Sequence, residues 1–273
     1  MATIPDLSFL AKKYYYLARL YYVGTEKVMN NFSLAMDYFR RSAECGNEMG
    51  RFQLGLMYYF GTGEVVPSDS KKGVELFFQA YQGGNQYGAL FLGRCFQSGS
   101  GIRKDEKAAV KIYTELAEAG FSDGQVHLGK CYFHGVGVEQ DYGKAMELYR
   151  RAADQGNTAA MLYLYQSYRN GQGVEKDEKI AEEWLKKYFE HIPSDEDDEP
   201  VFWYEVNPEE YAEAMELFHK GADMGDADCQ YVLGMFYLLG DGVVTSLSKA
   251  RILLSKAAEQ GHKKAKELIK EHF

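Results

Sequence analysis

His127, Cys131 and His134 are the residues whose types and spacing most resemble a chemical site. They lie at positions i, i+4 and i+7, so they share one face of a predicted helix. Imidazole and thiolate groups bind zinc, but a structural zinc site has four protein ligands. In a similar stretch of the chain, Phe91 and Ser98 occupy the positions that correspond to His127 and His134. Such a mixture of residue types is typical of a partly buried contact between helices. This face supports the alternative interpretation, an enzyme or metal-binding protein. The preferred interpretation has no catalytic residues, metal ion or cofactor.

Two further patterns could indicate chemistry. The Gly135-Val136-Gly137 sequence looks like part of a phosphate-binding loop, but such a Gly-x-Gly pair occurs five times at equivalent places and the rest of the motif is missing. We interpret it as a helix-ending turn. No Ser, Cys or Lys lies in a recognisable nucleophile motif. A serine–histidine–acid site assembles only in the fold, so the sequence leaves this possibility open.

An internal repeat organises the elements that position these residues. The stretches Ala35–Gly46, Ala145–Gly156 and Ala214–Gly225 are close copies of one another. Weaker copies begin at Gly73, Ala109, Ala181 and Ala250. A period of about 36 residues predicts an all-α, right-handed superhelical α/α solenoid of about seven helix-turn-helix repeats. Such repeats share one elongated core, so residues 1–273 are expected to form a single solenoid domain.

Each regular repeat has the same internal pattern, most complete in the fourth. Leu128, Gly129 and Tyr132 belong to the first helix, where the glycine allows the second helix to approach closely. That glycine costs about 1 kcal/mol in helix propensity, which the packing must offset. After the Gly-x-Gly turn, Asp141 can accept hydrogen bonds from the free amides of the second helix. Asp69, Asp105 and Asp177 are equivalent. We therefore expect these acids to cap helices.

The sixth repeat breaks the pattern. The expected repeats are residues 14–47, 48–85, 86–121, 122–157, 158–192, 193–226 and 227–262, with a polar capping helix at 263–273. In the sixth, the first helix would fall within a proline-flanked acidic run, which predicts a loop. Its second helix is expected from about residue 209 to 224, judged by the apolar periodicity.

The acidic loop, residues 193–200, has two interpretations. Its acids are Asp195, Glu196, Asp197, Asp198 and Glu199. Charge runs are usually solvated, so a plain insertion is one interpretation. The other is a regulatory or partner-facing element, anchored by Phe202 and Trp203, whose burial would cover the flanks left open by the missing helix.

A binding groove is predicted on the first helices. Positions two and five after the repeat leucine lie opposite the packed stripe of each helix. They form two rows: Leu56, Arg94, Lys130 and Gln166, and Tyr59, Gln97, Phe133 and Arg169. Arg and Tyr often dominate interface energetics, which favours a groove. The other interpretation is that these residues are solvated or pack between neighbouring first helices.

Composition limits the partner and the compartment. The net charge of −9 argues against nucleic acid and favours a basic or neutral partner. Four cysteines without a close pair indicate a reducing environment, so a cytoplasmic location is expected. No signal peptide is evident and no stretch is long and apolar enough for membrane insertion. The oligomeric state is not indicated.

The repeat resembles the Sel-1-like repeat family, which is related to tetratricopeptide repeats. The pattern Leu-Gly-x-x-Tyr, Gly-x-Gly-Val, Asp and Ala-Ala-x-x-Gly carries this resemblance over nearly the whole chain except residues 191–208 and the ends. The resemblance implies a non-enzymatic scaffold or adaptor whose first helices line a concave surface. We therefore expect this protein to bind a peptide, loop or helix of another protein there.

Overall fold

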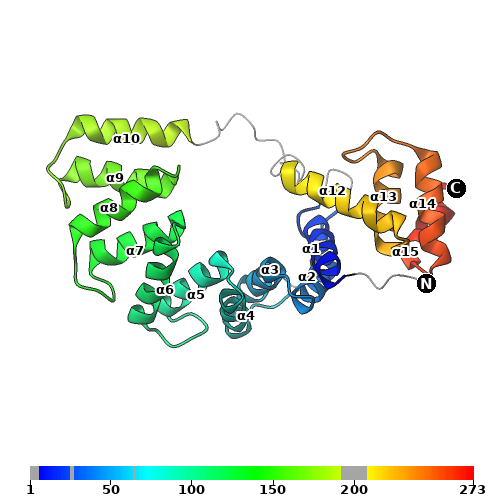
Figure 1. Cartoon of the computed structure of the whole chain (residues 1–273), viewed down its shortest axis with the longest axis horizontal. Helices are drawn as coiled ribbons and strands as arrows, with labels where there is room; N and C mark the ends of the chain where they lie inside the picture. The colour runs from blue at the N-terminus through cyan, green and yellow to red at the C-terminus, as the bar shows by residue number, and fades with distance from the viewer. Residues whose placement is uncertain (1–5, 25–27, 64–65, 192–207) are drawn as a thin grey trace. The chain divides into compact units, whose positions relative to one another are not determined.

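The computed structural model describes residues 6–24, 28–63, 66–191 and 208–273, most of which lie in α-helices (Figure 1). The first helices of the repeats are α1 (Leu7–Val23), α3 (Glu48–Phe60), α5 (Gln86–Ser98), α7 (Ser122–His134), α9 (Thr158–Asn170) and α13 (Ala227–Leu239). The second helices are α2 (Phe32–Glu44), α4 (Ser70–Gln82), α6 (Glu106–Glu118), α8 (Tyr142–Ala153), α10 (Glu178–Glu190), α12 (Pro208–Asp223) and α14 (Leu247–Glu259). None of the described helices has the length and apolar character needed to cross a bilayer.

This alternation confirms the predicted α/α solenoid of about seven helical repeats. The capping helix is also present as α15 (Lys263–His272), whose first free amides are capped by His262. The sixth repeat contributes its second helix, α12. The expected loop 193–200 and its anchor, Phe202 and Trp203, lie outside the described residues.

Capping residues set the helix ends. The Asp141 carboxylate accepts a hydrogen bond from the Lys144 amide at 2.9 Å, which satisfies a free donor at the start of α8. The predicted caps Asp69, Asp105 and Asp177 act in the same way. Glycine ends several of the helices. Gly135, which follows α7, has a φ of 67°, a left-handed conformation that glycine adopts without steric cost.

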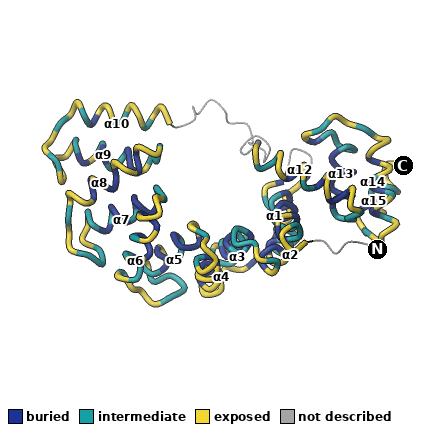
Figure 2. Tube along the Cα trace, in the orientation of Figure 1, coloured by how far each residue is buried: buried dark blue, intermediate teal, exposed yellow. Residues whose placement is uncertain are grey.

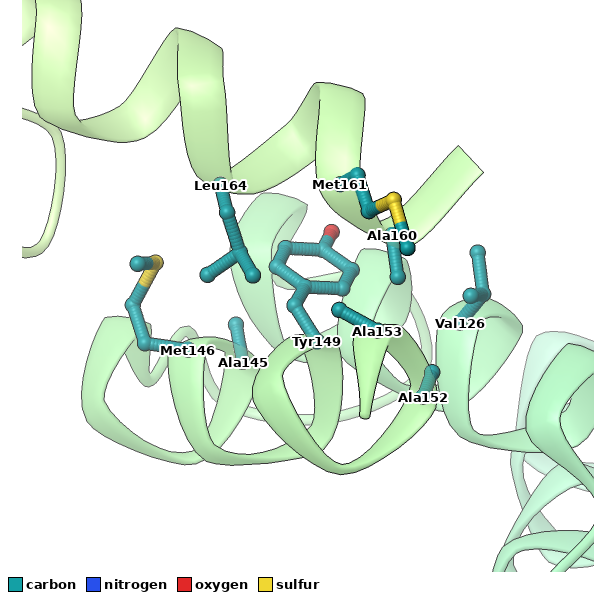
Figure 3. Packing of buried hydrophobic residues seen from close by; sticks show 9 residues of the cluster. All are labelled: Val126, Ala145, Met146, Tyr149, Ala152, Ala153, Ala160, Met161 and Leu164. Carbon is teal, nitrogen blue, oxygen red and sulfur yellow. The ribbon is translucent and has the colours of Figure 1, made fainter. Parts of the chain in front are cut away.

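A glycine of the first helix lies against an aromatic ring of the second helix. A Cβ atom added to Gly129 would lie 2.6 Å from Cε1 of Tyr149, closer than real atoms pack. Figure 3 shows the Tyr149 ring beside Leu164 and Met161 of α9, so one ring joins two successive repeats. The equivalent pairs are Gly55 with Phe77 and Gly93 with Tyr113. Close helix approach and a buried aromatic therefore form the repeated core (Figure 2).

The chain divides into two compact units. One comprises Met1–Gly50 with Glu199–Phe273, and the other comprises Arg51–Asp198. Within Arg51–Asp198, helices pack mainly on their neighbours in sequence, as in a solenoid. The single continuous domain therefore stays a prediction.

In the first unit, α1 packs on α2 and also reaches the C-terminal repeats (Figure 1). The Lys13 ammonium lies 2.8 Å from a carboxylate oxygen of Asp226 and 3.2 Å from one of Asp228. The Arg19 guanidinium lies 3.3 Å from a Glu210 carboxylate oxygen on α12. A helix from the first repeat thus borders the sixth repeat, of which the described residues contain the second helix, α12.

Lys13 is the most deeply buried charge in this contact, with 3% of its side chain exposed. Burial opposes its charge, but Asp228 and Asp226 outweigh that effect and raise the pKa of Lys13. Farther along α1, the Tyr21 and Tyr231 hydroxyls are hydrogen-bonded. The Lys264 ammonium of α15 lies 4.9 Å from the Tyr21 ring centroid. The first helix of the chain therefore contacts α13 and α15 as well as α12.

Replacing Gly129 with Ala tests the close helix approach. We expect a loss of about 1–3 kcal/mol in unfolding free energy, because the added methyl displaces Tyr149. Gly143→Ala is the control, since Gly143 is an exposed helical glycine whose nearest neighbour would be 3.3 Å away. That variant should gain up to about 1 kcal/mol. Equal effects in chemical denaturation would contradict the packing argument.

Lys13→Met tests the contact between α1 and the C-terminal repeats. Removing the ammonium takes the charged partner away from two partly buried carboxylates, Asp226 and Asp228, so we expect a loss of about 3 kcal/mol. Lys12→Met is the matched control because its pair with Glu213 is about half exposed, and it should cost less than about 1 kcal/mol. Thermal unfolding of both variants measures the difference. A Lys13→Met variant as stable as Lys12→Met would show that the buried pair contributes little.

Candidate functional site

A hollow of about 720 Å³ opens on the first helices of three consecutive repeats in the unit Arg51–Asp198. It is formed by α3, α5 and α7 together with the turn after α5. Its lining residues are Tyr59, Phe60, Phe91, Arg94, Cys95, Gln97, Ser98, Ser100, His127 and Lys130. We call this hollow the basic groove, because its charged lining residues are cations.

Neighbouring helices contribute matching pairs of residues to the groove. Phe91 and Arg94 are three residues apart on α5, and His127 and Lys130 hold the same relation on α7. Residues three apart are neighbours on a helix surface, so each pair presents one ring and one cation together. The Arg94 guanidinium lies 4.7 Å from the Phe91 ring centroid, within the range of a cation–π contact.

Aromatic side chains form the wall on α3. The Tyr59 and Phe60 ring centroids lie 4.9 Å apart, and Tyr59 also packs 5.6 Å from the buried Phe77 of α4. Phe60 meets Phe91 edge to face at 6.5 Å. Phe60 is nevertheless 63% exposed, which leaves an apolar ring available at the groove entrance.

Buried residues hold the polar part of the groove in place. The Tyr113 hydroxyl donates to Oε1 of Gln97 at 3.4 Å. This leaves Nε2 of Gln97 without a hydrogen-bond partner in the described part of the chain. Ser98 is tied to its own helix, since its hydroxyl donates to the Arg94 carbonyl at 2.9 Å. The groove therefore offers side-chain donors on a fixed frame.

The electrostatic character of the groove is positive. Arg94 and Lys130 have no carboxylate within ion-pair distance among the described residues, and no acid lines the hollow. Burial is the main reason that the pKa of His127 is lowered to about 4, and the charges of Lys130 and Arg94 contribute in the same direction. His127 is therefore neutral at pH 7, and part of its pKa shift comes from the positive charges beside it.

The structure brings together four of the eight residues of the predicted rows: Tyr59, Arg94, Gln97 and Lys130. Arg169 lies in a separate hollow beside Glu178 and Glu182, where it donates to the Tyr165 hydroxyl. Phe133 packs against Tyr142 and Tyr149 of the second helix, so the core holds it. Leu56 is half-buried on α3 and Gln166 is exposed on α9. The partner-binding role of all eight stays a prediction.

The His127, Cys131 and His134 side chains do not form one cluster. His127 lies 5.0 Å from the Tyr113 ring, Cys131 is fully buried, and His134 is exposed beside Phe133. Burial raises the pKa of the Cys131 thiol to about 11, so it is not a thiolate at pH 7. No group of three or more His, Cys, Asp or Glu residues arranged for a metal ion occurs in the described residues.

The sequence analysis did not assign Phe60, Phe91, Cys95, Ser98 or Ser100 to the groove, and it considered His127 only as a metal ligand. A signal for two of them was present. Phe91 and His127 each precede the repeat leucine by one position, three residues before the predicted cations Arg94 and Lys130. Extending the predicted face by one i, i+3 step would have included both rings.

The titration of His127 tests the positive potential. Its imidazole should protonate near pH 4 in an NMR titration, and Lys130→Gln should raise that pKa because a repelling charge is removed. Between pH 6.5 and 4 the unfolded chain binds a proton that the folded chain does not, so stability should fall as pH falls. Lys111→Gln, an exposed change on α6, should leave the pKa unchanged. An ordinary pKa near 6.5 would contradict the arrangement.

Comparisons with known proteins agree with this architecture. The Sel1 repeat profile matches residues 14–47, 49–85, 86–121, 122–157, 159–187, 205–226 and 227–262. No curated protein matches the chain. The crystal structure of c5321, a protective antigen present in uropathogenic Escherichia coli strains and displaying an SLR fold, is 30% identical, with a TM-score of 0.58. The match covers 96% of this chain, which spans 66% of the antigen's length.

A Sel1 repeat protein from Oxalobacter formigenes has a TM-score of 0.61 and is 24% identical, with 93% of this chain and 88% of that chain covered. At that identity, it supports the fold alone. Seven matches to one repeat profile, spread over most of the sequence, decide the assignment. The chain belongs to the Sel1 repeat family.

Proposed function

We propose that this chain is a non-enzymatic scaffold that binds a peptide, loop or helix of another protein in the basic groove. Sel1 repeats are generally protein–protein interaction modules. The observation that carries the proposal is the lining of the groove by an exposed ring, Phe60, and two cations, Arg94 and Lys130, that form no ion pair with any described residue. Aromatic and Arg side chains are those that most often dominate interface energetics.

The chain itself contains an example of this kind of binding. Helix α1 packs on α12, the second helix of the sixth repeat, and contacts α13 and α15 through Lys13 and Tyr21. The C-terminal repeats therefore accept an amphipathic helix that is distant in sequence. The groove on α3, α5 and α7 is a hollow on other repeats of the same family.

The acidic segment Asp195–Glu199 is proposed as a regulatory element. It carries the charge opposite to that of the basic groove, so it could compete with a ligand of the same sign. Replacing its acids with Asn and Gln would then strengthen partner binding, most clearly at low salt. Unchanged affinity at all salt concentrations would remove this part of the proposal.

Photo-crosslinking tests the scaffold function directly. A benzoylphenylalanine in place of Phe60 should crosslink one segment of a partner in cell extract, mapped by mass spectrometry. Phe189, an equally exposed ring on α10, is the matched control position. Crosslinks from both positions to the same set of proteins would indicate non-specific contact and contradict the proposal.

Charge reversal gives the matching energetic test. Arg94→Glu combined with Lys130→Glu should abolish capture of the crosslinked partner, because both cations face the groove. Arg94 is exposed and Lys130 half-buried, and neither forms an ion pair with a described residue. Surface substitutions of this kind alter folding free energy by only about 0.5 kcal/mol each, so helicity and the melting temperature should stay nearly unchanged. Capture that survives the double change would place the binding surface elsewhere.

A further inference from the structure

The charge of the basic groove differs from that of the chain around it. The sequence has 40 acidic and 31 basic residues, yet none of the described acids lines this hollow. Arg94 and Lys130 thus lack the carboxylate partners that many other cations in the described residues have, such as Lys13 and Arg19. Unpaired cations in a hollow attract an anionic ligand and repel a cationic one.

The uncharged residues of the groove also favour an anionic ligand. Oε1 of Gln97 accepts from Tyr113, and Nε2 of the same amide donates to no group among the described residues. His127 is neutral at pH 7, so its imidazole can lie beside a ligand without changing the net charge of the groove. The groove therefore presents charged and neutral donors together, which suits the acceptor oxygens of carboxylates.

The spacing of the cations limits how carboxylates can be arranged. Arg94 and Lys130 occupy equivalent positions on α5 and α7, the first helices of successive repeats, and both line the groove. Two carboxylates that reach both cations must lie on one face of the peptide. In the polyproline II conformation, which has three residues per turn and rises about 3.1 Å per residue, acids three residues apart share a face and lie about 9 Å apart. The exposed Phe60 ring, close to Phe91, would pack against an apolar side chain of the same peptide.

We infer that the basic groove binds an acidic peptide segment, with two carboxylates about three residues apart next to an aromatic or large apolar residue. The inference rests on the proposed function and specifies the chemistry of its partner. It reverses the expectation drawn from net charge, which favoured a basic or neutral partner. Local charge decides here, because interactions between exposed charges are screened beyond about 8 Å at physiological salt.

Three fluorescein-labelled peptides on one Gly-Ser background test the inference. They contain Phe-Glu-Gly-Ser-Glu, Phe-Gln-Gly-Ser-Gln or Phe-Lys-Gly-Ser-Lys, and binding is followed by fluorescence polarisation. The acidic peptide should bind at least about tenfold more tightly than the neutral one, since a charge-assisted hydrogen bond contributes more than a neutral one. It alone should raise the pKa of His127, measured by NMR, by placing negative charge near the imidazole.

Matched variants locate the bound peptide. Arg94→Gln and Lys130→Gln should each weaken the acidic peptide about tenfold or more, as expected for loss of a charge-assisted hydrogen bond. Lys111→Gln removes the same charge at an exposed position of α6 that does not line the groove, and it should leave affinity unchanged. Circular dichroism of each variant separates lost binding from lost folding.

Four outcomes would overturn the inference. These are equal or tighter binding of the neutral or basic peptide, no binding by any of the three, insensitivity to Arg94→Gln and Lys130→Gln, and tighter binding of a single-stranded oligonucleotide than of the acidic peptide. The proposed function is judged separately by the Phe60 crosslink. If the crosslinked partner segment contains no acids, the proposed scaffold function is retained and only the inference of an acidic ligand is wrong.

Discussion

The contact between a glycine of the first helix and an aromatic ring of the second supports both the stacking and the groove. At Gly93 any larger residue would overlap the Tyr113 ring, which is fully buried. The same Tyr113 hydroxyl holds Gln97 in the groove, and its ring lies 5.0 Å from His127 of the next repeat. One buried side chain therefore sets the helix spacing and positions two groove residues. Binding geometry here follows from core packing, because rigid elements position functional groups more precisely than loops do.

The groove also shows how a repeat array acquires a distinct site. Every regular repeat presents the same positions on its first helix, but the residues there differ. The rows carry Arg94 and Lys130 in the third and fourth repeats, and Gln166 in the fifth. A neighbouring hollow around Arg169 includes Glu178 and Glu182, which offset its charge. Repetition supplies the frame, and substitution within two or three repeats supplies the chemistry.

Much of the fold could be predicted from the sequence because it rests on periodic, local signals. Helix caps such as Asp141 and turn glycines such as Gly135 are read from residue type and spacing. The contact of α1 with the C-terminal repeats could not be read in this way. Lys13 and Asp226 are 213 residues apart, and nothing local to either shows that they form an ion pair. For a similar reason, the sequence could not show that half of the predicted groove residues lie outside the hollow. A helix-face angle does not show that Phe133 turns into the core or that Arg169 has acids beside it.

The central claim is that a partner segment lies across the first helices with its acids on Arg94 and Lys130. A crystal structure of this chain with the acidic peptide tests it most directly. The account predicts one carboxylate within 4 Å of each cation, with the peptide ring against Phe60. A peptide seated instead on the second helices, or on the turn around Arg103 and Lys104, would contradict it.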